Sequence, residues 1–235
     1  MSAAATGGGR PRPGIAGGAD GGWIDISLPI RATSVPWAGL ASPIVAPVAA
    51  IAAGDSVNVG VLTACLHTAT HADAPFHVAD AGATIDRVGL DAYLGPARLV
   101  RLAGGGPIDA AALAAAGLPA DSPWPERLLL ATGQPYNGEH WPATAPYLTP
   151  DAAAACVAGG VRLVGLDVPS VDPLDSRALV AHHTLLGGGV AIVENLRLAD
   201  LAPGAYWLAA VPLAIVGGDA SPIRAVVRRL DDGAP

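Results

Sequence analysis

The sequence predicts an α/β protein with one domain built on a mixed sheet. Stretches rich in β-branched residues alternate with Ala-rich stretches that carry helix-start and helix-stop residues, and the helical stretches cluster in the second half of the chain. Hydrophobic residues make up 51% of the 235 residues and charged residues only 14%, which excludes a disordered chain. This length suits a single domain, and we place it at residues 23–235.

The first half of the chain predicts strands that lead into a histidine-rich segment. Residues 1–22 are mainly Gly, Ala, Pro and Arg without periodicity, so we expect a disordered N-terminal tail. Residues 23–30 alternate apolar and polar side chains, as a strand does. Residues 44–54 and 55–67 are apolar and β-branched, and the second stretch is expected to run as a strand into the histidines. A short helix or turn at 87–95 and a strand at 96–102 follow.

The second half predicts helices with recognisable ends. Residues 107–117 form a helix with Asp109 near the N-cap, and residues 149–160 form another, with Thr149 as the cap, Pro150 in the first position and Gly159 at the stop. The remaining elements are buried strands at 127–133 and 161–171, an irregular stretch at 134–146, a helix at 178–189, strands at 190–196 and 205–218, and a helix or strand at 221–230.

Charge and cysteine content exclude several classes of protein. The net charge of -7 and the absence of a basic patch argue against a nucleic-acid partner. Two cysteines are too few for a disulfide scaffold. No apolar run reaches the roughly 18 residues of a membrane span, and no signal-peptide pattern is present. We therefore expect a cytoplasmic protein without a membrane partner.

The segment His67–His77, HTATHADAPFH, holds three of the six histidines and one carboxylate, Asp73. Imidazole and carboxylate are ligands of zinc, manganese and iron. In an extended strand His67 and His71 would stand about 13 Å apart, too far for one ion. Pro75 disfavours a helix. We therefore expect a turn that wraps around an ion.

Two further segments carry polar groups next to apolar strands. Glu194 shares a strand face with apolar residues, which is costly unless the carboxylate is paired or bound to a metal, although an exposed edge strand remains open. His182 and His183 are adjacent on a helix, so both cannot face one site. The polar residues Asp167, Ser170 and Asp172 follow a buried strand and serve either a site or plain turn formation.

Three other residues have simpler interpretations. His140 is expected to be an ordinary loop histidine and Cys65 a buried thiol. Trp37 lies between Pro36 and Gly39 and is either a hydrophobic plug or an aromatic wall for a substrate.

The histidine segment resembles the HxGTHxDxPxH signature of the cyclase-like metal hydrolases, and in particular of the bacterial kynurenine formamidases. The blocks WIDISLPI, VPWAG, AHHTLLGGGVAIVENL and the stretch from LAPGAYW to RAVV resemble that family in order, so the resemblance covers residues 23 to 230. It implies a compact β/β/α domain of the swivelling type, a homodimer, and two divalent ions in each subunit, usually zinc, with manganese as the alternative.

The resemblance also implies the ligands of the ions. His67, His71 and Asp73 match the ligands of the first ion. Asp73 and Glu194 would bridge to the second ion, whose histidine matches His182.

The activity implied by the resemblance is hydrolysis of a small aryl formamide, N-formyl-L-kynurenine, to L-kynurenine and formate in tryptophan degradation. His77 matches the proton-transfer histidine and Trp37 the substrate-facing tryptophan. Ala69 stands where the family usually has Gly, which matters only if this residue has a positive φ. Alternatives are hydrolysis of a cyclic or other aryl amide such as isatin, a cyclase or dehydratase reaction, or a non-catalytic metal-binding protein.

Overall fold

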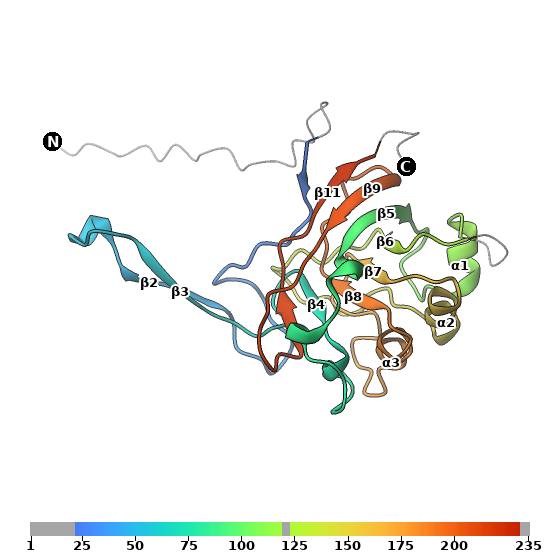
Figure 1. Ribbon diagram of the computed structural model, residues 1–235, viewed down its shortest axis with the longest axis horizontal. Coiled ribbons are helices and arrows are strands. Elements are labelled where there is room, and N and C mark those ends of the chain that lie inside the picture. The colour runs from blue at the N-terminus through green and yellow to red at the C-terminus, as the bar shows by residue number, and fades with distance from the viewer. Residues whose placement is uncertain (1–21, 119–122, 231–235) are drawn as a thin grey trace.

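The computed structural model describes residues 22–118 and 123–230, and its centre is a nine-stranded mixed sheet (Figure 1). The strand order is β1-β11-β9-β5-β6-β7-β8-β4-β10. Strands β5 to β8 run parallel to one another, and the other neighbouring strands are antiparallel. This confirms the α/β fold class with a mixed sheet. The predicted tail at 1–22 lies outside the described residues apart from Gly22.

The strands of the sheet have the following bounds: β1 Ile24–Asp25, β4 His71–Asp73, β5 Leu94–Arg101, β6 Arg127–Ala131, β7 Leu163–Leu166, β8 Ala191–Glu194, β9 Gly204–Ala209, β10 Ala220–Pro222 and β11 Val226–Arg229. The three α-helices are α1 Ala110–Ala115, α2 Pro150–Ala158 and α3 Val180–Gly187. Short 3₁₀ helices are η1 Ile51–Ala53, η2 Pro75–His77, η3 Ile85–Arg87 and η4 Leu90–Tyr93.

The sheet separates two hydrophobic cores. Leu128 and Leu130 of β6 face the core that the three helices cover, whereas Leu129 faces the other core. All five residues of β6 are buried, as in a strand covered on both faces. The helices lie together on one side, and the sheet curls around the second core (Figure 1). The two sides of the curled sheet and the layer of helices give the predicted β/β/α order of layers.

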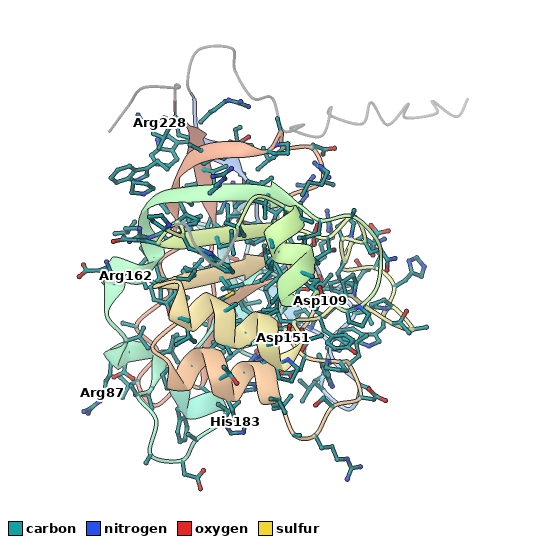
Figure 2. The ribbon with its side chains drawn as sticks, turned by 90° about the vertical axis from the view of Figure 1, so that its right-hand side faces the viewer. Arg87, Asp109, Asp151, Arg162, His183 and Arg228 are labelled. Atoms are coloured by element: carbon teal, nitrogen blue, oxygen red, sulfur yellow. The ribbon has the colours of Figure 1, made fainter. Side chains whose placement is uncertain are left out.

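The helix ends differ in how their caps work. Asp109 accepts a hydrogen bond from the amide of Ala112 at 2.7 Å, as predicted for the start of α1. Thr149 stands at the N-cap of α2, but the predicted side-chain cap is wrong. Its hydroxyl donates to the carbonyl of Ile108 at 3.1 Å, because a short parallel bridge brings that carbonyl close. Figure 2 shows Asp109 and Asp151 at the starts of α1 and α2.

Two predicted strands are shorter than expected because their amides bond elsewhere. Of residues 23–30, only Ile24–Asp25 forms a strand. The amide of Leu28 donates to Thr70 Oγ1 rather than to a neighbouring strand. Of residues 205–218, the ladder ends at Ala209, and the amide of Leu213 donates to the hydroxyl of Ser221. The stretch 221–230, open between helix and strand, contributes to β10 and β11.

A separate two-stranded hairpin projects from the body of the molecule (Figure 1). It consists of β2 Ile44–Ala49 and β3 Val59–Thr63. The expectation that 55–67 forms one strand into the histidines is wrong, because β3 ends at Thr63 and a turn follows. The hairpin exposes a set of large apolar side chains, defined as the hairpin patch: Ile44, Val45, Val48, Ile51, Val57, Val59, Val61 and Leu62.

None of the helices within residues 22–118 and 123–230 has the length and apolar character needed to cross a membrane.

Candidate metal centre

Two neighbouring strands carry three of the predicted ligands. His71 and Asp73 are the first and third residues of β4, so their side chains share one face of the strand. Glu194 ends β8 and is the cross-strand partner of His71. The expectation of a turn that wraps around an ion is therefore wrong for His71 and Asp73. In an extended strand, residues two apart already point to the same face, so the imidazole and the carboxylate lie together without a turn. Glu194 is buried, which excludes the exposed edge strand.

His67 reaches the same place through a sharp turn at Ala69. Ala69 has a φ of 57°, in the left-handed region that few residues other than Gly adopt. The turn brings the ring of His67 to a centroid distance of 4.9 Å from the ring of His71. Asn195, with a φ of 59°, donates from Nδ2 to the carbonyl of Ala69 at 2.9 Å and holds the turn. The methyl group at this position therefore costs conformational energy, as the departure from the family's Gly predicts.

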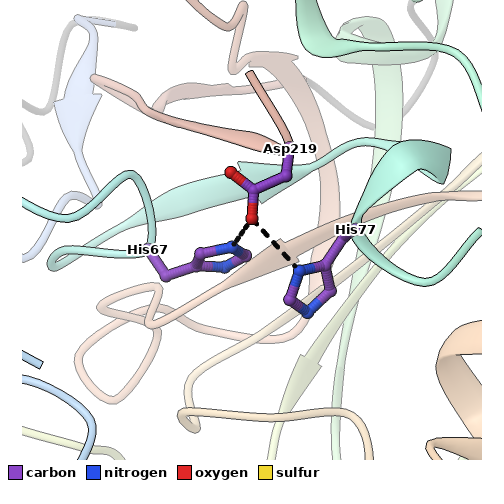
Figure 3. Close-up of side chains that lie close together, drawn as sticks. All are labelled: His67, His77 and Asp219. Carbon is purple, nitrogen blue, oxygen red and sulfur yellow. Dashed lines mark hydrogen bonds and ion pairs between the residues drawn. The ribbon is translucent and has the colours of Figure 1, made fainter. Parts of the chain in front are cut away.

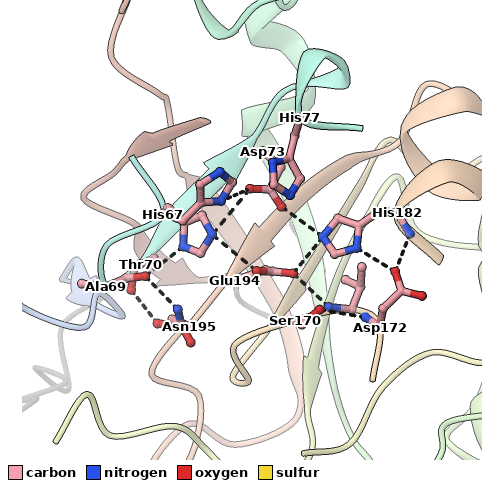
Figure 4. A network of polar contacts seen from close by, with 12 residues as sticks. His67, Ala69, Thr70, Asp73, His77, Ser170, Asp172, His182, Glu194 and Asn195 are labelled. Carbon is pink, nitrogen blue, oxygen red and sulfur yellow. Dashed lines mark hydrogen bonds and ion pairs between the residues drawn. The ribbon is translucent and has the colours of Figure 1, made fainter. Parts of the chain in front are cut away.

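The ligand atoms predicted from the sequence form two groups that share Asp73 (Figure 4), and a third group that could hold an ion, made of His67, His77 and Asp219, adjoins them. In the first group, Asp73 Oδ1 lies 3.1 Å from His67 Nδ1 and 3.5 Å from His71 Nε2. In the second, His182 Nε2 lies 3.5 Å from Asp73 Oδ2 and 3.4 Å from Glu194 Oε1. The other oxygen of Glu194, Oε2, lies 3.4 Å from His71 Nε2. Each carboxylate thus offers one oxygen to each group.

These atoms fit divalent cations. His71 Nε2 and both carboxylate oxygens of Asp73 are buried without a hydrogen-bond partner. Burying unsatisfied polar atoms is expensive, and a cation bound among them removes that cost. The donor atoms of each group lie within 4.8 Å of one another and are imidazole nitrogens and carboxylate oxygens, a donor set that suits zinc and manganese.

The far side of each buried histidine has its own hydrogen-bond acceptor. His71 Nδ1 donates to the carbonyl of Ala69 at 3.0 Å, and His182 Nδ1 lies 2.7 Å from Asp172 Oδ2. Asp172 also accepts from the amides of Ala181 and His182 at the start of α3. Asp172 therefore serves the site: it accepts from the first amides of α3 and it orients a histidine of the centre. Such contacts leave Nε2 of both rings free to face an ion.

The structure adds Asp219, which the sequence analysis missed. Its Oδ2 atom lies 2.9 Å from His67 Nε2 and 3.4 Å from His77 Nδ1 (Figure 3). The available signal was a carboxylate directly after two glycines at the end of an apolar stretch. His77 ends the 3₁₀ helix η2, and its half-buried ring stands 4.3 Å from that of His67.

The network of carboxylates stabilises positive charge. Burial acts to raise the pKa of Asp73, but the nearby imidazoles of His182 and His67 outweigh it and hold that pKa well below its ordinary value. Burial acts to lower the pKa of His67, and the contacts with Asp219 and Asp73 overcome this and raise it to about 10. The contact with Asp172, together with the two central carboxylates, likewise raises the pKa of His182 against the effect of burial. The centre is thus built to hold cationic charge.

Other candidate residues have different surroundings. His183 is exposed on α3 and lies on its outer side in Figure 2. His140 is an exposed loop residue, as expected. Cys65 is half-buried rather than buried, because it lies between the hairpin and the turn and not in a core. Ser170 lines the pocket beside the centre, whereas Asp167 accepts from the amide and hydroxyl of Thr132 and so joins the ends of the neighbouring strands β7 and β6.

A pocket of about 300 Å³ opens above the centre, and His67, His71, His77, His182 and Glu194 are among the residues that line it. Its outer wall is aromatic. Trp37 and Trp141 meet edge to face at 4.8 Å between ring centroids, and Tyr136 lies 5.5 Å from Trp141. The hydroxyl of Tyr136 donates to the carbonyl of Val35 at 2.6 Å and ties the two loops together. The sequence predicts Trp37 as a candidate substrate contact, whereas Trp141 and Tyr136 lie in the irregular stretch 134–146 and reach the pocket only in the fold.

Comparisons with known proteins agree with this geometry. A family model described as "Putative cyclase" matches residues 24–173. A kynurenine formamidase from Bacillus cereus is 41% identical over 207 residues, which cover 88% of this chain and 97% of the relative. A kynurenine formamidase from Geobacillus thermodenitrificans is 43% identical over 175 residues, covering 74% and 82%.

Solved structures show the same fold. A "predicted metal-dependent hydrolase" from Bacillus stearothermophilus is 26% identical with a TM-score of 0.73, and covers 88% of this chain and 98% of that one. Isatin hydrolase A from Labrenzia aggregata is 19% identical with a TM-score of 0.71, over 88% and 93% of the two chains. At that identity the second likeness concerns the fold alone.

Proposed function

The chain belongs to the cyclase family that includes the kynurenine formamidases, and from this premise we propose that it hydrolyses N-formyl-L-kynurenine to L-kynurenine and formate. It is a hydrolase of a linear formamide, and its reaction belongs to tryptophan degradation by the kynurenine pathway. One observation carries the proposal: two ligand groups that share Asp73, with Glu194 in contact with a histidine of each, face a pocket with aromatic walls.

The ligand assignment follows the two groups. His67, His71 and Asp73 would hold one ion, and His182 would hold the other together with Asp73 and Glu194 as bridging carboxylates. The buried nitrogen and oxygen atoms without partners support this assignment. We propose zinc as the metal, with manganese as the alternative, because both accept imidazole and carboxylate ligands.

The reaction needs one group that moves a proton. When bound, the ions would supply Lewis acidity, which lowers the pKa of a water and stabilises negative charge on the formyl oxygen. Burial lowers the pKa of His77, which favours a neutral ring able to accept a proton. His77 takes a proton from the attacking water and gives it to the aryl nitrogen as the C–N bond breaks. Water thus adds to the formyl carbon, and formate and the arylamine leave.

The aromatic wall positions the substrate. Trp37 and Trp141 present ring faces and edges to the pocket, and an aryl group packs favourably against such surfaces. We therefore propose that the aryl ring lies outward and the formyl group inward toward the centre.

The first experiment measures formate release from N-formyl-L-kynurenine. The purified protein is assayed as isolated, after chelation, and after addition of zinc or manganese. We expect turnover that chelation abolishes and one of the metals restores. Metal-loaded protein that releases no formate would overturn the substrate assignment, and isatin would then be the next substrate to assay.

A second experiment isolates the role of His77. His77→Ala is expected to lower kcat by about 100-fold or more, as for loss of a general acid–base group, with metal still bound. The matched control is His183→Ala, which removes an exposed imidazole from α3 and is expected to leave the rate unchanged. Full activity of His77→Ala with metal bound would contradict the assignment.

We also propose that the protein is a homodimer whose contact includes the hairpin patch. Val48 and Leu62 are 64% and 54% exposed, and an isolated two-stranded hairpin with such a surface is marginal in water. A second copy, which carries the same patch, would cover it in a two-fold contact. We expect a dimer in analytical ultracentrifugation and a weakened dimer for Val48→Glu. A wild-type protein that remains monomeric at high micromolar concentration would overturn the proposal.

A further inference from the structure

Asp219 contacts two histidines with different places in the site (Figure 3). Its Oδ2 atom lies 2.9 Å from His67 Nε2, on the side of that ring opposite the candidate ion. The same oxygen lies 3.4 Å from Nδ1 of His77, whose ring lines the pocket. A carboxylate oxygen has two lone pairs and accepts two hydrogen bonds, so one atom serves both rings.

The position of Asp219 is set by the strand that carries the ligands. The amide of Ala74 donates to the carbonyl of Asp219 at 2.9 Å, and the next residue, Ala220, pairs with Asp73 in the antiparallel ladder of β10 and β4. On the other side, Asp86 Oδ1 accepts from the amide of Gly217 at 3.1 Å. The backbone around Asp219 is therefore fixed relative to Asp73 and His77.

We propose that Asp219 is a positioning residue for the hydrolysis: it holds a hydrogen on His77 Nδ1 and so makes Nε2 the nitrogen that exchanges the proton. This inference rests on the proposed function and on the role of His77 in it. In a neutral imidazole one nitrogen carries the hydrogen and the other accepts, so an acceptor fixed at Nδ1 selects the tautomer. While His77 carries the transferred proton, both of its nitrogens bear hydrogen, and the carboxylate stabilises that positive ring.

The contact with His67 gives Asp219 a second effect on the same site. A carboxylate behind a metal-binding histidine orients the ring and makes its other nitrogen a stronger ligand for a metal ion. Asp172 contacts a single histidine ring, that of His182. Asp219 differs because it couples the ring facing the candidate ion with the ring that moves the proton. Loss of Asp219 is therefore expected to lower turnover even in protein that is fully loaded with metal.

The test uses Asp219→Asn in the metal-loaded protein with N-formyl-L-kynurenine. We expect kcat to fall by about 10- to 100-fold with KM within about twofold of the wild type, the range found when partners of metal-site histidines are removed. Nitrogen NMR of histidine-labelled protein is expected to show one Nδ1–H tautomer for His77 in the wild type and a mixture in the variant. The matched control, Asp80→Asn, removes an exposed carboxylate three residues after His77 and is expected to keep the wild-type kcat.

Several outcomes decide the proposal. A fall in kcat that matches lost metal occupancy, with the His77 tautomer unchanged, would leave Asp219 as a support of His67 only and overturn it. An unchanged kcat would overturn it as well. Asp219→Glu, which restores a carboxylate on a longer side chain, is expected to recover part of the rate. A wild-type protein inactive on the formamide would instead overturn the proposed function, while the NMR spectrum would still report whether Asp219 sets the tautomer.

Discussion

The candidate metal centre and the mouth of the pocket are built from opposite kinds of structure. The centre draws Asp73 and Glu194 from paired strands, and its histidines have hydrogen-bond partners behind their rings. The mouth consists of loops that bring Trp37 against Trp141 through a single edge-to-face contact. The strands fix atoms to within the tolerance that metal ligands need, whereas the loops present adaptable apolar surface.

Because of this difference, substitutions in the centre and substitutions at the mouth are expected to change different properties of the enzyme. Substitutions in the centre remove charged atoms that compensate one another, so their effects on metal binding and turnover are large. Substitutions at the mouth remove packing surface only, so they change the affinity for the substrate.

Loss of a bridging carboxylate tests the centre most severely. Glu194→Gln keeps the shape of a side chain that accepts from the amide of Val171 but removes its charge. We expect loss of bound metal and a fall in turnover on the order of 1,000-fold or more, because the reaction depends on the Lewis acidity of the ions. Metal analysis after dialysis and formate release check this. Glu139→Gln, on an exposed loop, is the control, and wild-type metal content in Glu194→Gln would contradict the bridging role.

The affinity of the centre for metal is expected to rise with pH. The pKa of His67 in the metal-free centre is raised to about 10 by Asp219 and Asp73 against the effect of burial, so the ring is protonated near pH 7 and must lose its proton to bind an ion. One displaced proton gives about a tenfold gain in affinity per pH unit below that pKa. Competition with a chelator between pH 6.5 and 8.5 measures the slope, and an affinity independent of pH would contradict it.

The raised pKa of His67 also predicts that the free energy of unfolding of the metal-free protein falls at alkaline pH. A raised pKa in the folded state stabilises the fold fully below the unfolded pKa of His67, near 6.5, and this stabilisation is lost as the pH rises toward 10.

Removing the charge behind His182 is expected to have an intermediate effect. Asp172→Asn keeps an acceptor for the start of α3 but weakens the contact with the ring, so metal affinity falls by about 10- to 100-fold. Metal titration followed by calorimetry measures it. Asp109→Asn changes the cap of α1 far from the centre and is expected to leave the affinity unchanged. Equal losses in both variants would assign the effect to helix capping.

Substitutions at the mouth of the pocket are expected to change KM. Trp141→Ala removes the partner of Trp37 and is expected to raise KM about fivefold with kcat almost unchanged, since an aromatic contact contributes about 1 kcal/mol. Steady-state kinetics measure the two constants separately. Trp23→Ala removes a tryptophan that is 52% exposed and packs against Arg228 instead, so it serves as the control. A fall in kcat alone would contradict the separation of mouth and centre.

The smallest effect concerns the backbone of the turn. Ala69→Gly is expected to stabilise the protein by about 1 kcal/mol, because Gly adopts the left-handed φ of 57° without the penalty of a methyl group. In thermal unfolding this corresponds to a Tm higher by about 2–4 °C for a protein of this size. Ala79→Gly, outside the left-handed region, is expected to lower the Tm. A lower Tm for Ala69→Gly would show that the turn carries no strain.

The sequence predicted the parts of the site that lie close together in the chain. His67, His71, Asp73 and His77 fall within eleven residues, so local density was enough to find them. Asp219 escaped because it is 152 residues from His67 and arrives only through the pairing of β10 with β4. Local pattern carries no information on such long-range pairing.

Helices and strands likewise divide into features that local sequence signals predict and features that depend on long-range packing. The helices at α1 and α2 were predicted from Asp109, Pro150 and Gly159, because their start and stop signals are local. The exposure of β2 and β3 could not be predicted, because β-branched residues fit a buried strand and an exposed hairpin equally well.

The pairing of strands from distant parts of the chain has a kinetic consequence. Ile24 pairs with Val227, and the candidate ligands extend from His67 to Glu194, so the centre is complete only after most of the sheet has formed. Contacts with such large sequence separation form slowly, because long loops must close first. Ions bound there would stabilise contacts that form late in folding, so we expect their removal to accelerate unfolding and barely change the rate of refolding. We therefore expect the occupancy of the candidate metal centre to govern the resistance of the protein to heat and proteolysis over hours.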